Sequence, residues 1–247
     1  MPALSALLRT VLVLGVVWQA LVWALSPPRY ILPAPLDVAA TLVGQWRFLG
    51  RHALVTLGEI AAGFAVGTAL GLAAALAVVA FPRMGRLAWP MVLVLQAFPV
   101  FVLAPLLVLW FGFGMASKVA MTTLIIFFPV ASAFADGLRR TAPELVDAAA
   151  LAAAGPLRIL LDIRVPLAMP ALISGLRVAA PLAPLGAVIG EWVGASAGLG
   201  FVMVQANARM QTDTVFAAMT VLAALTLLLR AAVDAAAPRL APWAHET

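Results

Sequence analysis

Long runs of apolar residues recur along this 247-residue chain, and their length is the strongest constraint on its fold. A helix needs about 17 to 25 mainly apolar residues to cross the roughly 30 Å hydrocarbon core of a bilayer. Six runs approach or reach that length, near residues 10–25, 54–80, 89–111, 118–135, 168–190 and 214–233. The sequence therefore predicts an all-α integral membrane protein with six transmembrane helices.

The composition agrees with this class of protein. Hydrophobic residues make up 65% of the chain and charged residues 10%, with a mean hydropathy of +1.11, whereas soluble domains are about one-quarter charged. The chain has no cysteine, which excludes disulfides and thiolate metal sites. A net charge of +5 would suit nucleic acid, but no basic stretch is interleaved with aromatic residues. Membrane lipid head groups are the expected counter-ions.

The basic residues predict the orientation of the chain. With six spans both termini lie on one side, and ten basic residues share that side while five lie on the other. The ten are Arg9, Arg83, Arg86, Arg139, Arg140, Arg158, Arg164, Arg177, Arg230 and Arg239; the five are Arg29, Arg47, Arg51, Lys118 and Arg209. Because Lys and Arg are enriched in cytoplasmic loops, both termini are predicted to be cytoplasmic.

The first run has an alternative interpretation as a cleaved signal peptide. Arg9 would then be its basic region, and cleavage would fall near Ala24-Leu25-Ser26. Five spans would remain and would place the two ends on opposite sides, so we favour a retained first helix.

A polar-edged segment, residues 141–170, interrupts the apolar runs and predicts a helical hairpin. Thr141 and Glu144 have the spacing of a capping box, in which each side chain binds the backbone amide of the other residue. A helix is expected from this cap to Ala154, because the Ala- and Leu-rich run has high helix propensity.

The second arm of the hairpin follows a turn at Gly155 and Pro156. A short helix is expected from Leu157 to Arg164, ended by Pro166, because a proline disfavours the α conformation in the residue before it. Neither arm is long enough to span a bilayer. The hairpin is therefore interpreted as a docking site for another protein.

Small residues and prolines mark two of the spans. Gly63, Gly67 and Gly71 form a stripe on which a neighbouring helix packs closely, either within this chain or in a dimer. In the third span, a group of prolines with Gln96 interrupts the helical hydrogen bonds: Pro90, Pro99 and Pro105. Such a span either lines a translocation path or is a kinked, packed helix.

Polar residues at membrane depth are functional candidates by default. For Glu59 we expect a structural ion pair with Arg51 or Arg47. Glu191 precedes a glycine-rich stretch and either acts as a gate or supports a bend.

Two neutral polar residues are weaker candidates. Gln96 either binds a passing solute or forms an interhelical hydrogen bond, and Asn207 lies in a polar stretch where it is either solvated or on the path.

Catalytic patterns are missing from the sequence. His52 and His245 fall in loops on opposite predicted sides, so they cannot form a metal site or a triad. The phosphate-binding pattern G-x-x-x-x-G-K-[ST] does not occur. We predict a non-catalytic subunit with no cofactor and no catalytic or metal-binding residue.

In the hairpin, Asp147-Ala148-Ala149 is followed after three residues by Ala153, and the segment closes at Val165-Pro166. This series resembles the EAA loop of the inner-membrane permeases of binding-protein-dependent ABC importers. Asp replaces the Glu of that motif and Ala153 replaces its glycine. Because alanine favours an ordinary helical backbone, Gly155 is expected to have taken over the turn.

Further segments resemble the nitrate, sulfonate and taurine group of these permeases. They are Leu32-Pro33-Ala34-Pro35, Pro99, Ala104-Pro105-Leu106-Leu107, Leu109-Trp110-Phe111-Gly112, Ser117-Lys118, Ile126-Phe127-Phe128-Pro129, Glu191 and Gly198-Leu199-Gly200. Within the group, the chain looks most like permeases for pyrimidine precursors of thiamine, such as hydroxymethylpyrimidine. The alternatives are sulfonate, taurine or nitrate as substrate and, in another class, an ion-coupled secondary transporter, which would need acid relays and internal repeats.

The resemblance implies a type I ABC importer permease fold with a cytoplasmic coupling helix. It implies an N-terminal helix and periplasmic segment (1–50), a permease domain (51–237) and a cytoplasmic tail (238–247). Its partners would be ABC ATPase subunits that hydrolyse the ATP, a second permease copy and a periplasmic binding protein. The implied coupling residues are Glu144, Asp147, Ala148, Ala149, Ala153, Gly155, Val165 and Pro166; the implied path residues are Gln96, Pro99, Glu191 and Asn207.

Overall fold

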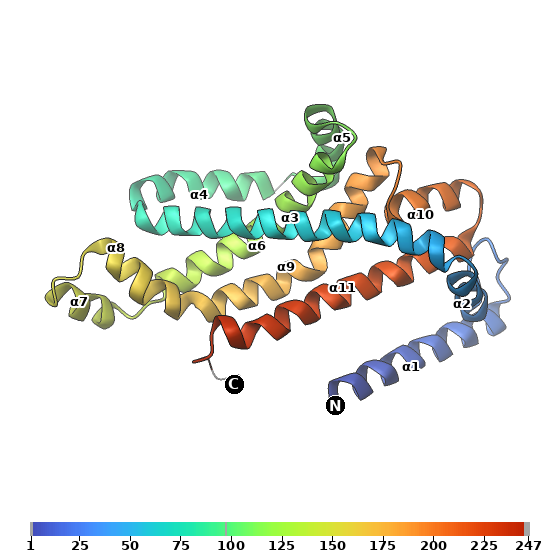
Figure 1. Cartoon of the computed structure of the whole chain (residues 1–247), viewed down its shortest axis with the longest axis horizontal. Helices are drawn as coiled ribbons and strands as arrows, with labels where there is room; N and C mark the ends of the chain where they lie inside the picture. Colours follow the sequence, from blue (N-terminus) through green and yellow to red (C-terminus); the bar gives the residue numbers. More distant parts are fainter. Residues whose placement is uncertain (1, 97, 245–247) are drawn as a thin grey trace.

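The computed structural model describes residues 2–96 and 98–244, and these form a bundle of helices without a β-strand (Figure 1). The helices are α1 (Pro2–Leu25), α2 (Pro35–Gly44), α3 (Trp46–Ala80), α4 (Pro82–Gln96), α5 (Val100–Phe111), α6 (Met115–Arg139), α7 (Pro143–Leu151), α8 (Pro156–Arg158), the π-helical turn η1 (Ile159–Arg164), α9 (Val165–Gly194), α10 (Leu199–Ala208) and α11 (Thr212–Leu240). The all-α prediction is confirmed for this part of the chain.

Four of the six expected spans are clear. Helices α3, α6, α11 and the continuous stretch Pro156–Gly194 are long and apolar enough to cross a membrane. The first run lies in α1, whose apolar portion Leu12–Leu25 is shorter. The count of six stays a prediction.

The third expected span, 89–111, is wrong as a single helix. Helix α4 ends at Gln96 and α5 begins at Val100, with Pro99 in an extended conformation at its N-cap. Proline has no backbone N–H and disfavours helix in the residue before it, so the break falls where the sequence placed a proline. The predicted interruption is confirmed.

The centre of the bundle is α6, which packs between α3 and α9. The glycine stripe of α3 makes this approach close: a Cβ added at Gly67 would lie 2.6 Å from Ile126 Cγ1, and Gly71 faces Val130 in the same way. Helix α6 therefore covers the stripe, as the packing interpretation predicted. The alternative of a dimer seam on this stripe is wrong.

The two ends of the bundle differ in charge. The end of α3, the start of α4, helices α7 and α8 and the end of α11 gather at one end, while α2, α10 and the start of α3 lie at the other (Figure 1). The first end carries seven arginines, namely Arg83, Arg86, Arg139, Arg140, Arg158, Arg164 and Arg239, and the second carries four, Arg29, Arg47, Arg51 and Arg209.

Candidate functional site

The hairpin is the first part of the candidate site, and its outer arm projects from the bundle (Figure 1). Helix α7 has no buried residue. Two of its leucines are exposed, Leu145 by 48% and Leu151 by 89%, and Asp147 and Ala148 are exposed beside them. An apolar helix surface left uncovered by its own chain is typical of a protein–protein contact.

The predicted capping box is wrong. The Thr141 hydroxyl donates to the carbonyl oxygen of Leu138 at 3.2 Å, and α7 begins at Pro143 without a side-chain cap. The reason is the proline, which holds Ala142 in an extended conformation (φ −56°, ψ 128°) and makes it the N-cap. Glu144 then lies in the first turn, where its charge complements the helix dipole.

The turn between the two arms also differs from expectation. Ala153 has a left-handed backbone (φ 57°), whereas Gly155 is extended (φ −69°, ψ 159°). Ala154 N donates to Ala149 O and Ala153 N to Ala150 O, both at 3.0 Å. This is a Schellman motif with alanine at the position where glycine is usual. The prediction that Gly155 had taken over the turn is therefore wrong.

The second arm does not end at Pro166. Pro156–Arg158, the π-helical turn and α9 form one 39-residue helix. Val165 N donates to Leu160 O, a wider turn than in an α-helix, and this widening comes directly before Pro166, which has no N–H to donate. The second arm of the hairpin is thus continuous with a membrane helix.

A groove of about 570 Å³ lies beneath the hairpin. Val146 and Ala150 of α7 form one wall, and Ala80 at the end of α3 and Leu160 of η1 contribute others. The hairpin therefore has little support from the bundle and is held mainly through its two ends.

A buried polar network forms the second part of the site. Glu191 of α9 is only 2% exposed and accepts hydrogen bonds from Thr56 Oγ1 at 2.6 Å and from the backbone N–H of Gly200. Thr56 Oγ1 in turn accepts from Leu199 N at 2.8 Å, and His52 Nδ1 accepts from Gly198 N at 3.0 Å. Side chains of α3 and α9 together cap the N-terminus of α10. Glu191 therefore supports the bend, and its gating role stays a prediction.

Sequence reasoning missed the partners in this network. His52 lies on α3, not in a loop, and His245 falls outside the described residues. Nothing in the sequence marked Thr56 as a functional residue. Its spacing of four from His52 places both side chains on one face of α3, and this matters only because the start of α10 lies against that face.

The predicted ion pair of Glu59 with Arg51 or Arg47 is wrong. Glu59 is 5% exposed and its carboxyl faces that of Glu191, with Lys118 as the neighbouring positive charge. Lys118, 1% exposed, donates to the carbonyl oxygens of Phe113 and, at 3.4 Å, Gly194. Glu59 points into the bundle, away from the two exposed arginines at the start of its helix.

The four predicted path residues do not share one cavity. An open cavity of about 950 Å³ lies among α5, α9, α10 and α11 and includes Asn207 but not Pro99 or Glu191. Pro99 is exposed at the start of α5, and the side chain of Gln96 lies outside the described part. The lining of this cavity is apolar and aromatic, with Phe101 and Trp192, and contains no Lys, Arg, Asp or Glu.

Comparison with known families gives one match over most of the chain. Residues 67–245 match the family described as the binding-protein-dependent transport system inner membrane component. The match includes the hairpin, the cavity and, of the buried network, Lys118, Glu191 and the residues that begin α10.

Curated relatives match the chain nearly end to end. A probable ABC transporter permease protein of Haemophilus influenzae is 46% identical over 231 residues, which cover 92% of this chain and 94% of the relative. The formylaminopyrimidine transport permease protein ThiX of Halalkalibacterium halodurans is 34% identical over 233 residues, covering 94% and 93%.

A solved structure shares the fold. The inward-facing MetNI methionine ABC transporter contains a chain with a TM-score of 0.69 and 19% identity, and the match covers 80% of this chain and 98% of that one. At this identity the likeness concerns the fold alone. It identifies the architecture as the type I ABC importer permease fold.

Replacing Ala153 by glycine should stabilise the hairpin. A left-handed alanine costs about 1 kcal/mol relative to glycine, so Ala153→Gly should slow backbone hydrogen exchange across residues 143–158 by about fivefold. Ala152→Gly is the matched control, because Ala152 has an ordinary negative φ of −79° and gains nothing from glycine. Equal hydrogen-exchange rates in Ala153→Gly and the parent chain would contradict backbone strain at Ala153.

Removing the Glu191 carboxylate should destabilise the bundle. Glu191→Ala leaves the N–H of Gly200 and the hydroxyl of Thr56 without their buried acceptor, which should lower the free energy of unfolding by at least about 2 kcal/mol. Denaturant titration of the detergent-solubilised chain measures the change. The exposed Glu144→Ala is the control and should unfold near the parent midpoint; equal midpoints for both variants would refute the role of the network.

Proposed function

Since the chain belongs to the family of inner-membrane components of binding-protein-dependent transport systems, we propose that it forms half of the translocation pathway of an ATP-driven importer for a pyrimidine precursor of thiamine. It is an inner-membrane ABC permease of the nitrate, sulfonate and taurine group. Proteins of this family work with ATPase subunits and a binding protein. Its relatives are non-catalytic subunits, and we assign ATP hydrolysis to a separate ATPase subunit.

The continuity of the hairpin with α9 is the observation that carries the coupling mechanism. Helix α7 has no buried residue, and the second arm runs through η1 into α9 as 39 helical residues. At 1.5 Å per residue this rod is about 58 Å long. Its far portion includes Pro184 and Trp192, which line the open cavity. A displacement of the hairpin by an ATPase would therefore move one wall of that cavity.

The coupling surface is assigned to the exposed part of this hairpin. Asp147 and Ala148 face solvent, and Ala149 is half-buried. Ala153 and Gly155 shape the turn, while Val165 and Pro166 lie where the lever joins α9. ATP-driven closure of the ATPases would move the lever between two states, as differential binding requires.

The orientation follows from the charged ends. Ten of the fifteen basic residues are assigned to the side of the hairpin, and basic residues are enriched on the cytoplasmic side. We place the hairpin and both termini in the cytoplasm, with six membrane-crossing segments, of which the α4–α5 pair is the discontinuous one.

A second copy of the permease would complete the pathway. The wall of the open cavity exposes large apolar side chains on α9 and α11, with Leu185 exposed by 52%, Trp192 by 56% and Met219 by 50%. A half-pathway needs such an unfilled face, and a second copy would present the same surface.

The chemistry of the cavity supports a flat, uncharged solute. Trp192 and Phe101 offer aromatic faces, and Asn207 and Thr226 offer hydrogen-bonding groups. A sulfonate or nitrate anion would find no cation among the lining residues. The ThiX relative is named for formylaminopyrimidine, which has this flat, heteroaromatic character.

Reversing the charge of Asp147 should uncouple the importer. Asp147→Arg should abolish the stimulation of ATP hydrolysis by the loaded binding protein while leaving membrane insertion intact, because it disrupts an exposed contact and no packing. The measurement is ATP hydrolysis by the assembled complex in nanodiscs. Asp136→Arg, an exposed acid on α6 outside the hairpin, should keep the stimulation. Retained coupling in Asp147→Arg would overturn the lever.

Trp192 should determine the rate of uptake for a pyrimidine. Stacking of a base on an aromatic ring contributes about 1–3 kcal/mol, so Trp192→Ala should reduce uptake of labelled hydroxymethylpyrimidine into proteoliposomes about tenfold. The control is Trp23→Ala on α1, whose ring is 75% exposed and lies away from the cavity. If excess taurine or nitrate reduced the uptake of the labelled pyrimidine and unlabelled pyrimidine did not, the substrate class would be contradicted.

A further inference from the structure

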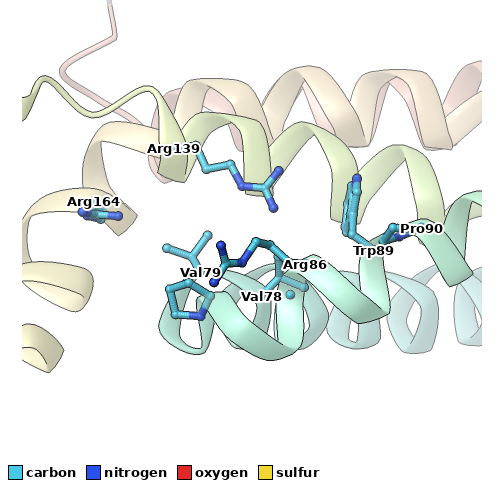
Figure 2. A pocket seen from close by; sticks show the side chains of 9 residues that line it. Val78, Val79, Arg86, Trp89, Pro90, Arg139 and Arg164 are labelled. Carbon is cyan, nitrogen blue, oxygen red and sulfur yellow. The ribbon is translucent and has the colours of Figure 1, made fainter.

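A second cavity lies at the hairpin end of the bundle, and three arginines surround it (Figure 2). Its volume is about 640 Å³. Arg86 comes from α4, Arg139 from the end of α6 and Arg164 from η1, so segments far apart in the sequence bring three positive charges to one space. Figure 2 shows Arg86 and Arg139 extending toward that space from opposite walls, with Arg164 beside them.

These charges have no acidic partner in the described part of the chain. None of the three arginines forms an ion pair within 4.0 Å, and no Asp or Glu lines the cavity. The acids closest to them in sequence, Asp136 on α6 and Asp162 on η1, are exposed and lie outside the lining. Three like charges around one cavity repel one another, so an anion bound among them would be favourable.

The remaining walls are apolar and aromatic. Val78 and Val79 of α3 and Pro82 and Pro90 of α4 also line the cavity. Trp89 lies on the same side, and the guanidinium of Arg139 is 5.5 Å from the centre of its ring. Tryptophan beside basic residues is typical of the level of the lipid head groups. The cavity thus combines a cationic rim with a surface suited to hydrocarbon.

We propose that this cavity binds the phosphate of an anionic phospholipid from the cytoplasmic leaflet. Arginine binds phosphate oxygens through paired, charge-assisted hydrogen bonds, and basic pockets between membrane helices recognise anionic head groups. The acyl chains would lie along the valines and prolines of α3 and α4. The bound phosphate would connect α4, α6 and η1, and so would fasten the root of the hairpin to the bundle.

The decisive experiment measures lipid binding to the full chain without its ATPase, so its outcome is independent of the proposed transport. Native mass spectrometry of the detergent-purified chain would count bound phosphatidylglycerol against phosphatidylcholine. Each basic residue at a lipid surface contributes about fivefold to affinity, so the combined Arg86→Gln, Arg139→Gln and Arg164→Gln variant should bind phosphatidylglycerol about a hundredfold more weakly.

The matched control removes the same charge from the other end of the bundle. The combined Arg47→Gln, Arg51→Gln and Arg209→Gln variant should retain phosphatidylglycerol binding. Equal losses in the two triple variants would overturn the site, because they would show attraction by net charge alone. The three single variants at the cavity, each expected to weaken binding about fivefold, test the site independently if the triple variant does not fold.

Two further measurements identify the source of the phosphate. Brominated phosphatidylglycerol should quench the fluorescence of Trp89, because the lipid would lie beside that ring. This part of the quenching should be absent in Trp89→Phe. Inorganic phosphate at millimolar concentration should not displace the lipid. Displacement by inorganic phosphate, or quenching that is unchanged in Trp89→Phe, would overturn a lipid site and indicate a site for free anions or no site.

Discussion

The buried carboxylate of Glu191 is the interaction on which the half of this bundle opposite the hairpin depends. A helix that begins inside a membrane protein leaves its first N–H groups without partners, and lipid offers none. Here α10 receives its partners from two other helices: Glu191 of α9 binds Gly200, while Thr56 and His52 of α3 bind the two residues before it. The cap therefore fixes where α3, α9 and α10 meet, and α10 becomes a wall of the open cavity.

The glycines at this cap follow from the same constraint. Gly198 has a φ of 110°, which residues with a side chain rarely adopt, and a Cβ at Gly200 would lie 2.7 Å from Glu191 Oε2. Only a backbone without side chains brings the N–H groups this close to the carboxylate. Glu59 and Lys118 complete the interior, and Lys118 donates to two backbone carbonyl oxygens. The polar centre is thus a joint between helices.

A structural feature could be predicted from the sequence when its physical cause lies within a short segment of the chain. The membrane helices, the break at Pro99 and the hairpin follow from apolar length, proline chemistry and polarity, all of which can be read along the chain. The prediction of a capping box at Thr141 was wrong because Pro143 restricts the backbone of Ala142, and this restriction outweighs the hydrogen bonds of a capping pair. The prediction of an ordinary helical backbone at Ala153 was wrong because the hydrogen bonds of a Schellman motif impose a left-handed conformation at this position, whatever the side chain. The partners of Glu59 and Glu191 depend on tertiary contact, for which sequence spacing carries no signal.

The two halves of the molecule have opposite mechanical character, and this contrast is what a transporter subunit requires. Close helix packing at the glycine stripe and the capped α10 make the interior rigid, since packed interiors have few alternative arrangements. The hairpin has no buried residue in its outer arm, yet its inner arm is continuous with α9. A force applied to the hairpin would therefore enter the bundle through η1, where the helix widens before Pro166. That turn lies beside the arginine-lined cavity, so the phospholipid that we propose for the cavity would also fasten the hairpin at its root.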